Sequence, residues 1–131
     1  VGPAGGMIIG ILGGVMCFTA TYYLKQKIKI DDSLDVFPVH GVGGIVGTLL
    51  AAVFVSQELG VFSGNGYAEG MTMASQLGVQ VIGILATGAY TAVVTIILFK
   101  LVGYMTSGVR VSGEEEQIGL DISDHDEKGY T

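Results

Sequence analysis

Cysteine and charged residues are both scarce in this chain of 131 residues. The single cysteine, Cys17, excludes a disulfide framework and a zinc or iron–sulfur site built from several cysteines. Only 14% of the residues are charged and 50% are hydrophobic, whereas soluble domains carry about 25% charged residues. This composition argues against a soluble globular domain and against intrinsic disorder. The net charge of −6 argues against nucleic acid as a partner.

Sequence motifs of common enzyme classes are missing as well. The chain contains no P-loop, no HExxH zinc motif, no GxSxG nucleophile elbow and no CxxC pair. Its acidic residues occur in the loops and towards the C-terminus, outside the apolar segments. We therefore predict a protein that is not an enzyme and that needs neither a metal ion nor a cofactor.

Long apolar runs are abundant. Three of them lack Asp, Glu, Lys and Arg altogether, namely residues 1–24, 36–57 and 70–99. A helix needs about 20 apolar residues to cross the hydrocarbon core of a bilayer, and each run reaches that length. We predict an all-α membrane protein with transmembrane helices over about residues 3–24, 36–57 and 72–100. The predicted transmembrane region covers residues 1–104, and a cytoplasmic tail covers residues 105–131.

The basic residues predict the orientation of these helices. They follow the first and the third apolar run, at Lys25, Lys27, Lys29, Lys100 and Arg110. The loop 58–69 between the second and third runs contains none. Short loops rich in Lys and Arg stay in the cytoplasm. We therefore expect a cytoplasmic loop 25–35, a cytoplasmic C-terminus and an outward-facing loop 58–69.

His40 is the ionisable side chain inside the second run. Such a residue is costly in a membrane and is a candidate functional residue by default, and imidazole exchanges protons near neutral pH. With α-helical spacing, Val36 shares its face, and this face continues in Gly43, Gly44 and Gly47. On such a face, His40 can lie beside a narrow apolar passage or a close partner helix. An interhelical hydrogen bond without a transport role is the alternative.

Three aspartates, Asp31, Asp32 and Asp35, precede the second run. Asp35 is placed to cap the helix, with Pro38 in the first turn, where proline is tolerated. All three carboxylates can cap the helix and pair with the lysines of the same loop, or form a cytoplasmic vestibule that attracts a cation. Gly43, Gly44 and Gly47 also have the spacing that permits close helix packing.

The tail is acidic and has its own local signals. Ser112 and Glu115 have the spacing of a capping box, and Gly119 is expected to end the resulting short helix. A solvated acidic tail without a further role is the alternative interpretation.

Three segments carry a resemblance to a known family: DDSLDVFPVHGVGGIVGTLLAAVF (31–54), YAEGMTMASQLGVQ (67–80) and GVRVSGEEEQIGLDISDHDEKGY (108–130). Together they resemble the C-terminal part of ammonium transporters of the Amt/Rh family. The resemblance implies a fragment with the last three spans of an eleven-helix fold, in a multi-pass protein of the cell membrane. It also implies a homotrimer in which each subunit has its own apolar pore for ammonium or ammonia.

The resemblance assigns roles to particular residues. His40 matches the second of two pore histidines, Val36 a pore-wall position, and Asp32 and Asp35 acidic positions beside the cytoplasmic end. The tail resembles a regulatory segment that takes part in control by PII-type signal proteins, through Gly108, Arg110, Glu115, Gly119, Asp121, His125 and Tyr130.

The expected function is therefore ammonium transport by a full-length protein. Two alternatives are an ammonium sensor that signals through its tail and a small structural membrane subunit with three spans.

Overall fold

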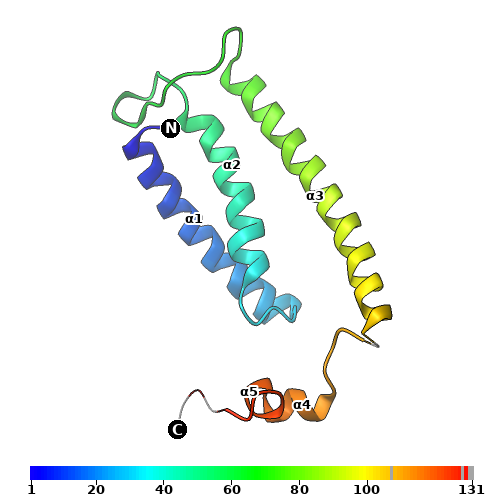
Figure 1. The fold of residues 1–131 in the computed structure, drawn as a ribbon. Coiled ribbons are helices and arrows are strands. Elements are labelled where there is room, and N and C mark those ends of the chain that lie inside the picture. Colours follow the sequence, from blue (N-terminus) through cyan, green and yellow to red (C-terminus); the bar gives the residue numbers. More distant parts are fainter. Residues whose placement is uncertain (107, 128, 130–131) are drawn as a thin grey trace. The chain divides into compact units, whose positions relative to one another are not determined.

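The computed structural model describes residues 1–106, 108–127 and 129, and within these residues it contains helices but no strands. The helices are α1 (Pro3–Tyr23), α2 (Gly43–Phe54), α3 (Met73–Met105), α4 (Gly113–Ile118) and α5 (Leu120–Ser123) (Figure 1). Two π-helical turns, Leu24–Ile28 and Phe37–Val42, continue α1 and precede α2, and a short 3₁₀ turn covers Gly60–Phe62.

Three helical segments are long and apolar enough to cross a membrane: Pro3–Ile28, Phe37–Phe54 and Met73–Met105. The predicted all-α class with three transmembrane helices is therefore confirmed. The chain separates into two units, Val1–Thr87 and Gly88–Thr131, and the border lies within α3. The predicted division into a membrane region over 1–104 and a tail over 105–131 stays a prediction.

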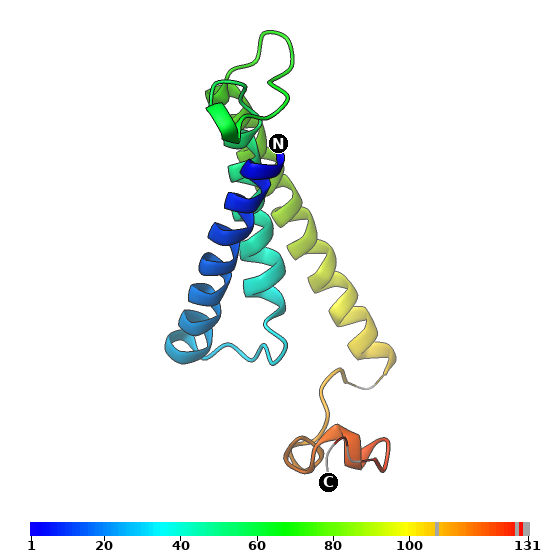
Figure 2. The ribbon, with the colours of Figure 1, turned by 90° about the vertical axis from the view of Figure 1, so that its left-hand side faces the viewer.

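In the first unit, α1 and α2 lie side by side and run in opposite directions (Figures 1 and 2). A glycine permits their close approach, because a Cβ atom at Gly43 would lie 2.9 Å from Cys17 Sγ. The Sγ atom itself lies 3.8 Å from the carbonyl oxygen of Val39, within the range of a weak S–H hydrogen bond. The start of the second span is thus held against the middle of the first.

The segment after α2 folds back over the end of that helix. The amides of Gly64 and Gly66 donate to the carbonyls of Ser56 and Val55, each at 2.7 Å. Gly64 has no room for a side chain, since an added Cβ atom would meet the backbone of Val55 at 2.6 Å. The segment 56–66 therefore folds as a cap over the end of α2.

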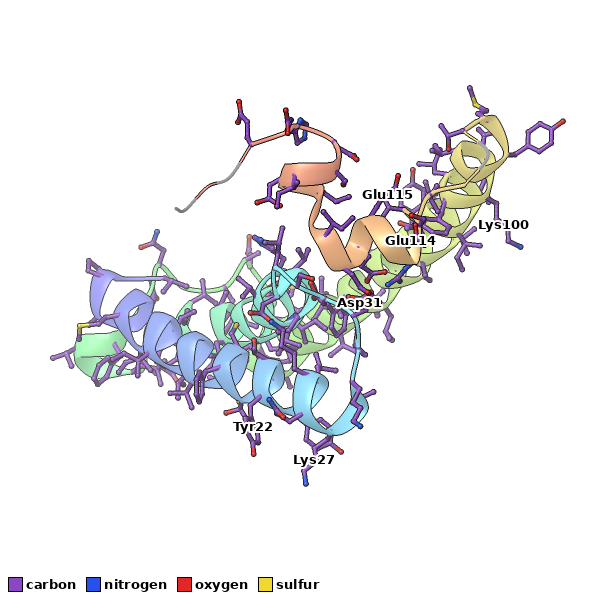
Figure 3. The ribbon with its side chains drawn as sticks, turned by 90° about the horizontal axis from the view of Figure 1, so that it is seen from below. Tyr22, Lys27, Asp31, Lys100, Glu114 and Glu115 are labelled. Carbon is purple, nitrogen blue, oxygen red and sulfur yellow. The ribbon has the colours of Figure 1, made fainter. Side chains whose placement is uncertain are left out.

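In the second unit, α4 begins with a complete capping box. The Ser112 hydroxyl accepts from the amide of Glu115, and the Glu115 carboxylate accepts from the amide of Ser112 at 2.8 Å. Gly119 ends α4 with a φ of 95°, a left-handed conformation that favours glycine. Both local predictions for the tail are confirmed. Figure 3 shows Glu114 and Glu115 on this first turn of α4.

Candidate pore histidine and the start of its helix

His40 lies in the π-helical turn Phe37–Val42, and its side chain is exposed. Within the described part of the chain, the imidazole makes no hydrogen bond. The alternative expectation of a hydrogen bond to another helix is therefore not met by any described residue. The ring is free to face a passage or another segment.

The π-turn changes the helical geometry around His40. The amide of Gly43 donates to the carbonyls of both Pro38 and His40, and the bond that spans five residues defines the π-turn. The predicted common face of Val36, His40 and the glycines assumed α-helical spacing. This spacing does not hold across Phe37–Val42, because each π-helical turn contains more residues than an α-helical turn.

The three glycines differ in their surroundings. Gly43 packs against Cys17, whereas a Cβ atom at Gly44 or Gly47 would meet no described atom within 4 Å. Close helix contacts at Gly44 and Gly47 therefore stay a prediction.

Asp32 closes the start of this helix with both oxygens of its carboxylate. Oδ1 accepts from the amide of Val36 at 2.9 Å, and Oδ2 accepts from the amide of Phe37 at 2.8 Å. These two bonds, the one from Phe37 being the stronger influence, lower the pKa of Asp32 because they favour the charged carboxylate. Of the aspartates expected to cap the helix, Asp32 therefore does so, and the side chain of Asp35 does not.

Asp35 has a different role at the same place. Its Oδ1 lies 2.8 Å from Lys25 Nζ, in a half-buried ion pair that connects the π-helical turn Leu24–Ile28 to the start of the second span. Its backbone carbonyl accepts from the amide of Val39 at 3.0 Å, and its own φ is 55°. The predicted pairing of the loop's acidic and basic residues is confirmed for Lys25 and Asp35.

The tail residues are held by local contacts. Arg110 Nη2 lies 2.7 Å from Glu116 Oε1, and hydrogen bonds from the Ser112 side chain and backbone lower the pKa of Glu115. Gly108 has a φ of 140°, Asp121 accepts through its carbonyl from the amide of Glu127 at 2.8 Å, and His125 is exposed. Tyr130 lies outside the described residues.

The chain also matches a known protein family. The model of the Ammonium Transporter Family matches residues 1–130. This chain belongs to the Ammonium Transporter Family.

Individual relatives support the family assignment. The chain is 37% identical to ammonium transporter Amt1 of Archaeoglobus fulgidus, over 97% of the chain and 31% of that protein. It is 36% identical to an ammonium transporter of Bacillus subtilis, over 99% of the chain and 31% of that protein. Ammonium transporter 1 of Schizosaccharomyces pombe is 38% identical over 99% of the chain and 27% of its own length. The chain thus spans about three tenths of the length of these transporters. Together with the three apolar helices, the family identifies a multi-pass membrane protein.

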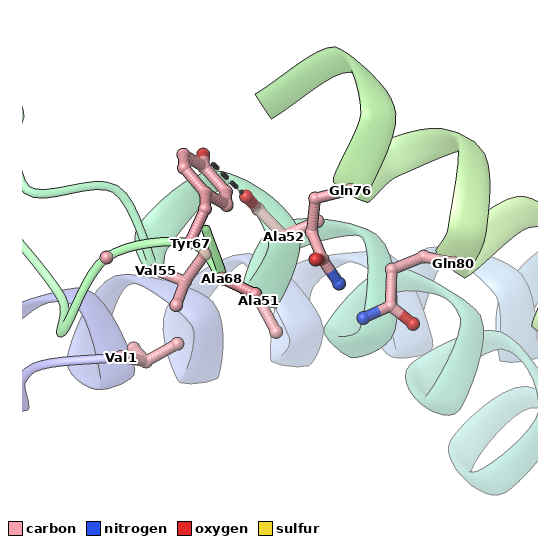
Figure 4. A pocket seen from close by; sticks show the side chains of 9 residues that line it. Val1, Ala51, Ala52, Val55, Tyr67, Ala68, Gln76 and Gln80 are labelled. Carbon is pink, nitrogen blue, oxygen red and sulfur yellow. Dashed lines mark hydrogen bonds between the residues drawn. The ribbon is translucent and has the colours of Figure 1, made fainter. Parts of the chain in front are cut away.

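Two structural features of this chain were not predicted from its sequence. The first is Tyr67, whose hydroxyl donates to the carbonyl of Ala52 at 2.9 Å, near the end of α2 (Figure 4). Tyr67 lines a shallow pocket of about 220 Å³ together with Gln76 and Gln80 of α3. The second is the π-turn at His40. A tyrosine in a loop has no fixed partner in sequence, and no periodic pattern indicates a π-turn.

Proposed function

We propose that this chain forms part of an ammonium transporter in which His40 lines an apolar pore. The relatives that cover nearly the whole chain are named ammonium transporters. The observation that carries the residue assignment is the exposed imidazole of His40 in a π-turn inside a membrane-spanning helix. An ionisable side chain inside a membrane-spanning segment is costly, and it is a candidate functional residue by default.

The proposed mechanism follows from the cost of moving charge through an apolar passage. An ammonium ion pays a large desolvation penalty there, whereas neutral ammonia pays much less. Releasing the proton before passage removes most of this cost. The imidazole of His40 can donate a hydrogen bond to ammonia or accept the released proton, because a neutral imidazole has one donor and one acceptor nitrogen.

The remaining assignments belong to the same proposal. In the full-length protein, these helices are the last three of an eleven-helix fold, and three such subunits form a homotrimer in the cell membrane. Val36 lines the cytoplasmic side of the pore, and Asp32 and Asp35 lie at its cytoplasmic mouth. The tail stays in the cytoplasm and provides a contact for a PII-type signal protein.

The proposal is tested by His40→Ala in the full-length protein, reconstituted in liposomes. We expect the ammonium-evoked response, followed as membrane current and as lumenal pH, to disappear or to change its balance of proton and ammonia flux. Val61→Ala, at an 81% exposed residue of the outer loop, is the control and keeps the wild-type response. An unchanged current, pH response and ion selectivity in His40→Ala, at equal protein content, contradicts the pore assignment.

A further inference from the structure

The start of the second span has an unusually complete set of backbone hydrogen bonds. The first amides of a helix have no partner inside the helix and need outside acceptors. Here the amides of Val36 and Phe37 donate to the carboxylate of Asp32, Pro38 has no amide hydrogen, and the amide of Val39 donates to the carbonyl of Asp35. One side chain therefore supplies both side-chain acceptors of this helix start.

We propose that Asp32 is a positioning residue for His40, acting through the π-turn that carries the imidazole. This inference rests on the proposed function of His40 and adds a residue on which that function depends. Asp32 does not touch the transported species in this role; it holds the backbone from which His40 projects.

The contacts of Phe37 connect Asp32 with the backbone around His40. The amide of Phe37 is bonded to Asp32 Oδ2 at 2.8 Å. The ring of Phe37 lies over Gly41, where an added Cβ atom would meet the ring carbons at 2.9 and 3.0 Å. Gly41 directly follows His40. A shift of Phe37 therefore displaces the backbone on both sides of the histidine.

The surroundings of Asp32 explain why the turn depends on it. Pro38 is fully buried, so the chain is anchored just beyond the capped amides. Lys25 holds the loop just before these amides. It forms an ion pair with Asp35 and donates a hydrogen bond to the carbonyl of Ser33. Between these two anchors, only the carboxylate of Asp32 holds the amides of Val36 and Phe37 among the described residues. Without it, the first turn can rewind towards α-helical geometry, and the direction of His40 changes.

A cap and an attractive charge make different demands on this position. A cap needs hydrogen-bond acceptors, which an asparagine side chain supplies in part. Attraction of a cation needs the negative charge, which asparagine lacks. Asp32→Asn therefore separates the two roles, and Asp31→Ala removes an equal charge from the neighbouring position of the same loop.

The experiment uses the full-length protein with ¹⁵N-labelled histidine and follows two quantities, ammonium flux per molecule and the His40 imidazole resonance. For Asp32→Ala we expect a shifted resonance and a flux lowered by up to about fivefold, since losing a helix cap changes a local equilibrium constant by about that factor. Asp32→Asn should lie between the wild type and Asp32→Ala in both quantities. Asp31→Ala should resemble the wild type. His40→Gln assigns the resonance.

An unshifted His40 resonance in Asp32→Ala overturns the inference, whether or not the flux falls. Equal losses in Asp32→Asn and Asp32→Ala also overturn it, because they show that the charge is what matters. If Asp32→Ala does not reach the membrane, Asp32→Asn alone is compared with the wild type, and a wild-type resonance at lowered flux then counts against the inference. A shifted resonance in Asp32→Ala together with wild-type ammonium flux in His40→Ala refutes the proposed function but leaves the positioning contact intact.

Discussion

At the residue scale, the carboxylates of Asp32 and Asp35 lie in the same loop but have different partners. Asp32 accepts hydrogen bonds from two backbone amides, and Asp35 forms an ion pair with Lys25 at 2.8 Å. The residue next to an expected helix start is the natural choice for the cap. Asp35 instead adopts a left-handed backbone conformation, with φ at 55°, and this lets the side chain of Asp32 reach the helix start. The spacing of the aspartates in the sequence does not reveal this backbone conformation at Asp35.

The lowered pKa of Asp32 predicts a pH dependence of its cap. A carboxylate with a depressed pKa in the folded state stabilises that state above the pKa of the unfolded chain, and the stabilisation is lost as pH falls through the folded pKa. We expect hydrogen-exchange protection of the Val36 and Phe37 amides to persist from neutral pH down to the ordinary aspartate range. It should fall only below that range. Loss of protection already near pH 6 would contradict the assignment.

Tyr67 provides a second prediction at this scale. Tyr67→Phe removes the hydroxyl that donates to the carbonyl of Ala52 and keeps the ring. We expect the free energy of unfolding to fall by about 1 kcal/mol, the typical net contribution of one hydrogen bond. Thermal unfolding of the full-length protein in detergent measures this change. Tyr22→Phe is a matched control, since the Tyr22 side chain is 58% exposed and projects outward from α1 (Figure 3); an equal loss in both variants would refute the contact.

At the element scale, the sequence predicted those features that depend on residues close together in the chain. The capping box and the glycine stop of α4 follow from residues within one turn, and both were predicted. The length of the apolar runs predicted the three spans for the same reason. The π-turn was not predicted, because no periodic sequence pattern indicates it. Whether Val36 and His40 share a face across this turn stays a prediction.

The capping box allows a direct test at this scale. Ser112→Ala removes the acceptor for the Glu115 amide, and we expect α4 to lose about 1 kcal/mol of stability, as is usual for a lost helix cap. Hydrogen exchange of the Glu115 and Glu116 amides in the full-length protein measures this loss. Ser123→Ala, which removes a hydroxyl from the neighbouring α5, is the control and leaves these amides protected. Equal protection in Ser112→Ala and the wild type would contradict the role of the cap.

At the scale of the whole molecule, the distribution of lysines predicts the orientation in the membrane. Leu34 in the loop 25–35 and Val61 in the loop 58–69 are similarly exposed, at 85% and 81%. In cells that express a cysteine-free full-length protein, a membrane-impermeant maleimide applied from outside should label Val61→Cys and not Leu34→Cys. After permeabilisation both should react. Labelling of Leu34→Cys in intact cells would reverse the predicted orientation and place the tail outside.

The central claim is that the protein containing this chain moves ammonium across a membrane. The most direct measurement applies an ammonium gradient to sealed liposomes with the purified full-length protein and records membrane current and lumenal pH together. We predict a response that saturates with ammonium and is absent from protein-free liposomes and from gradients of sodium or potassium. No ammonium response in either signal, with folded protein shown in the same liposomes, would contradict the account.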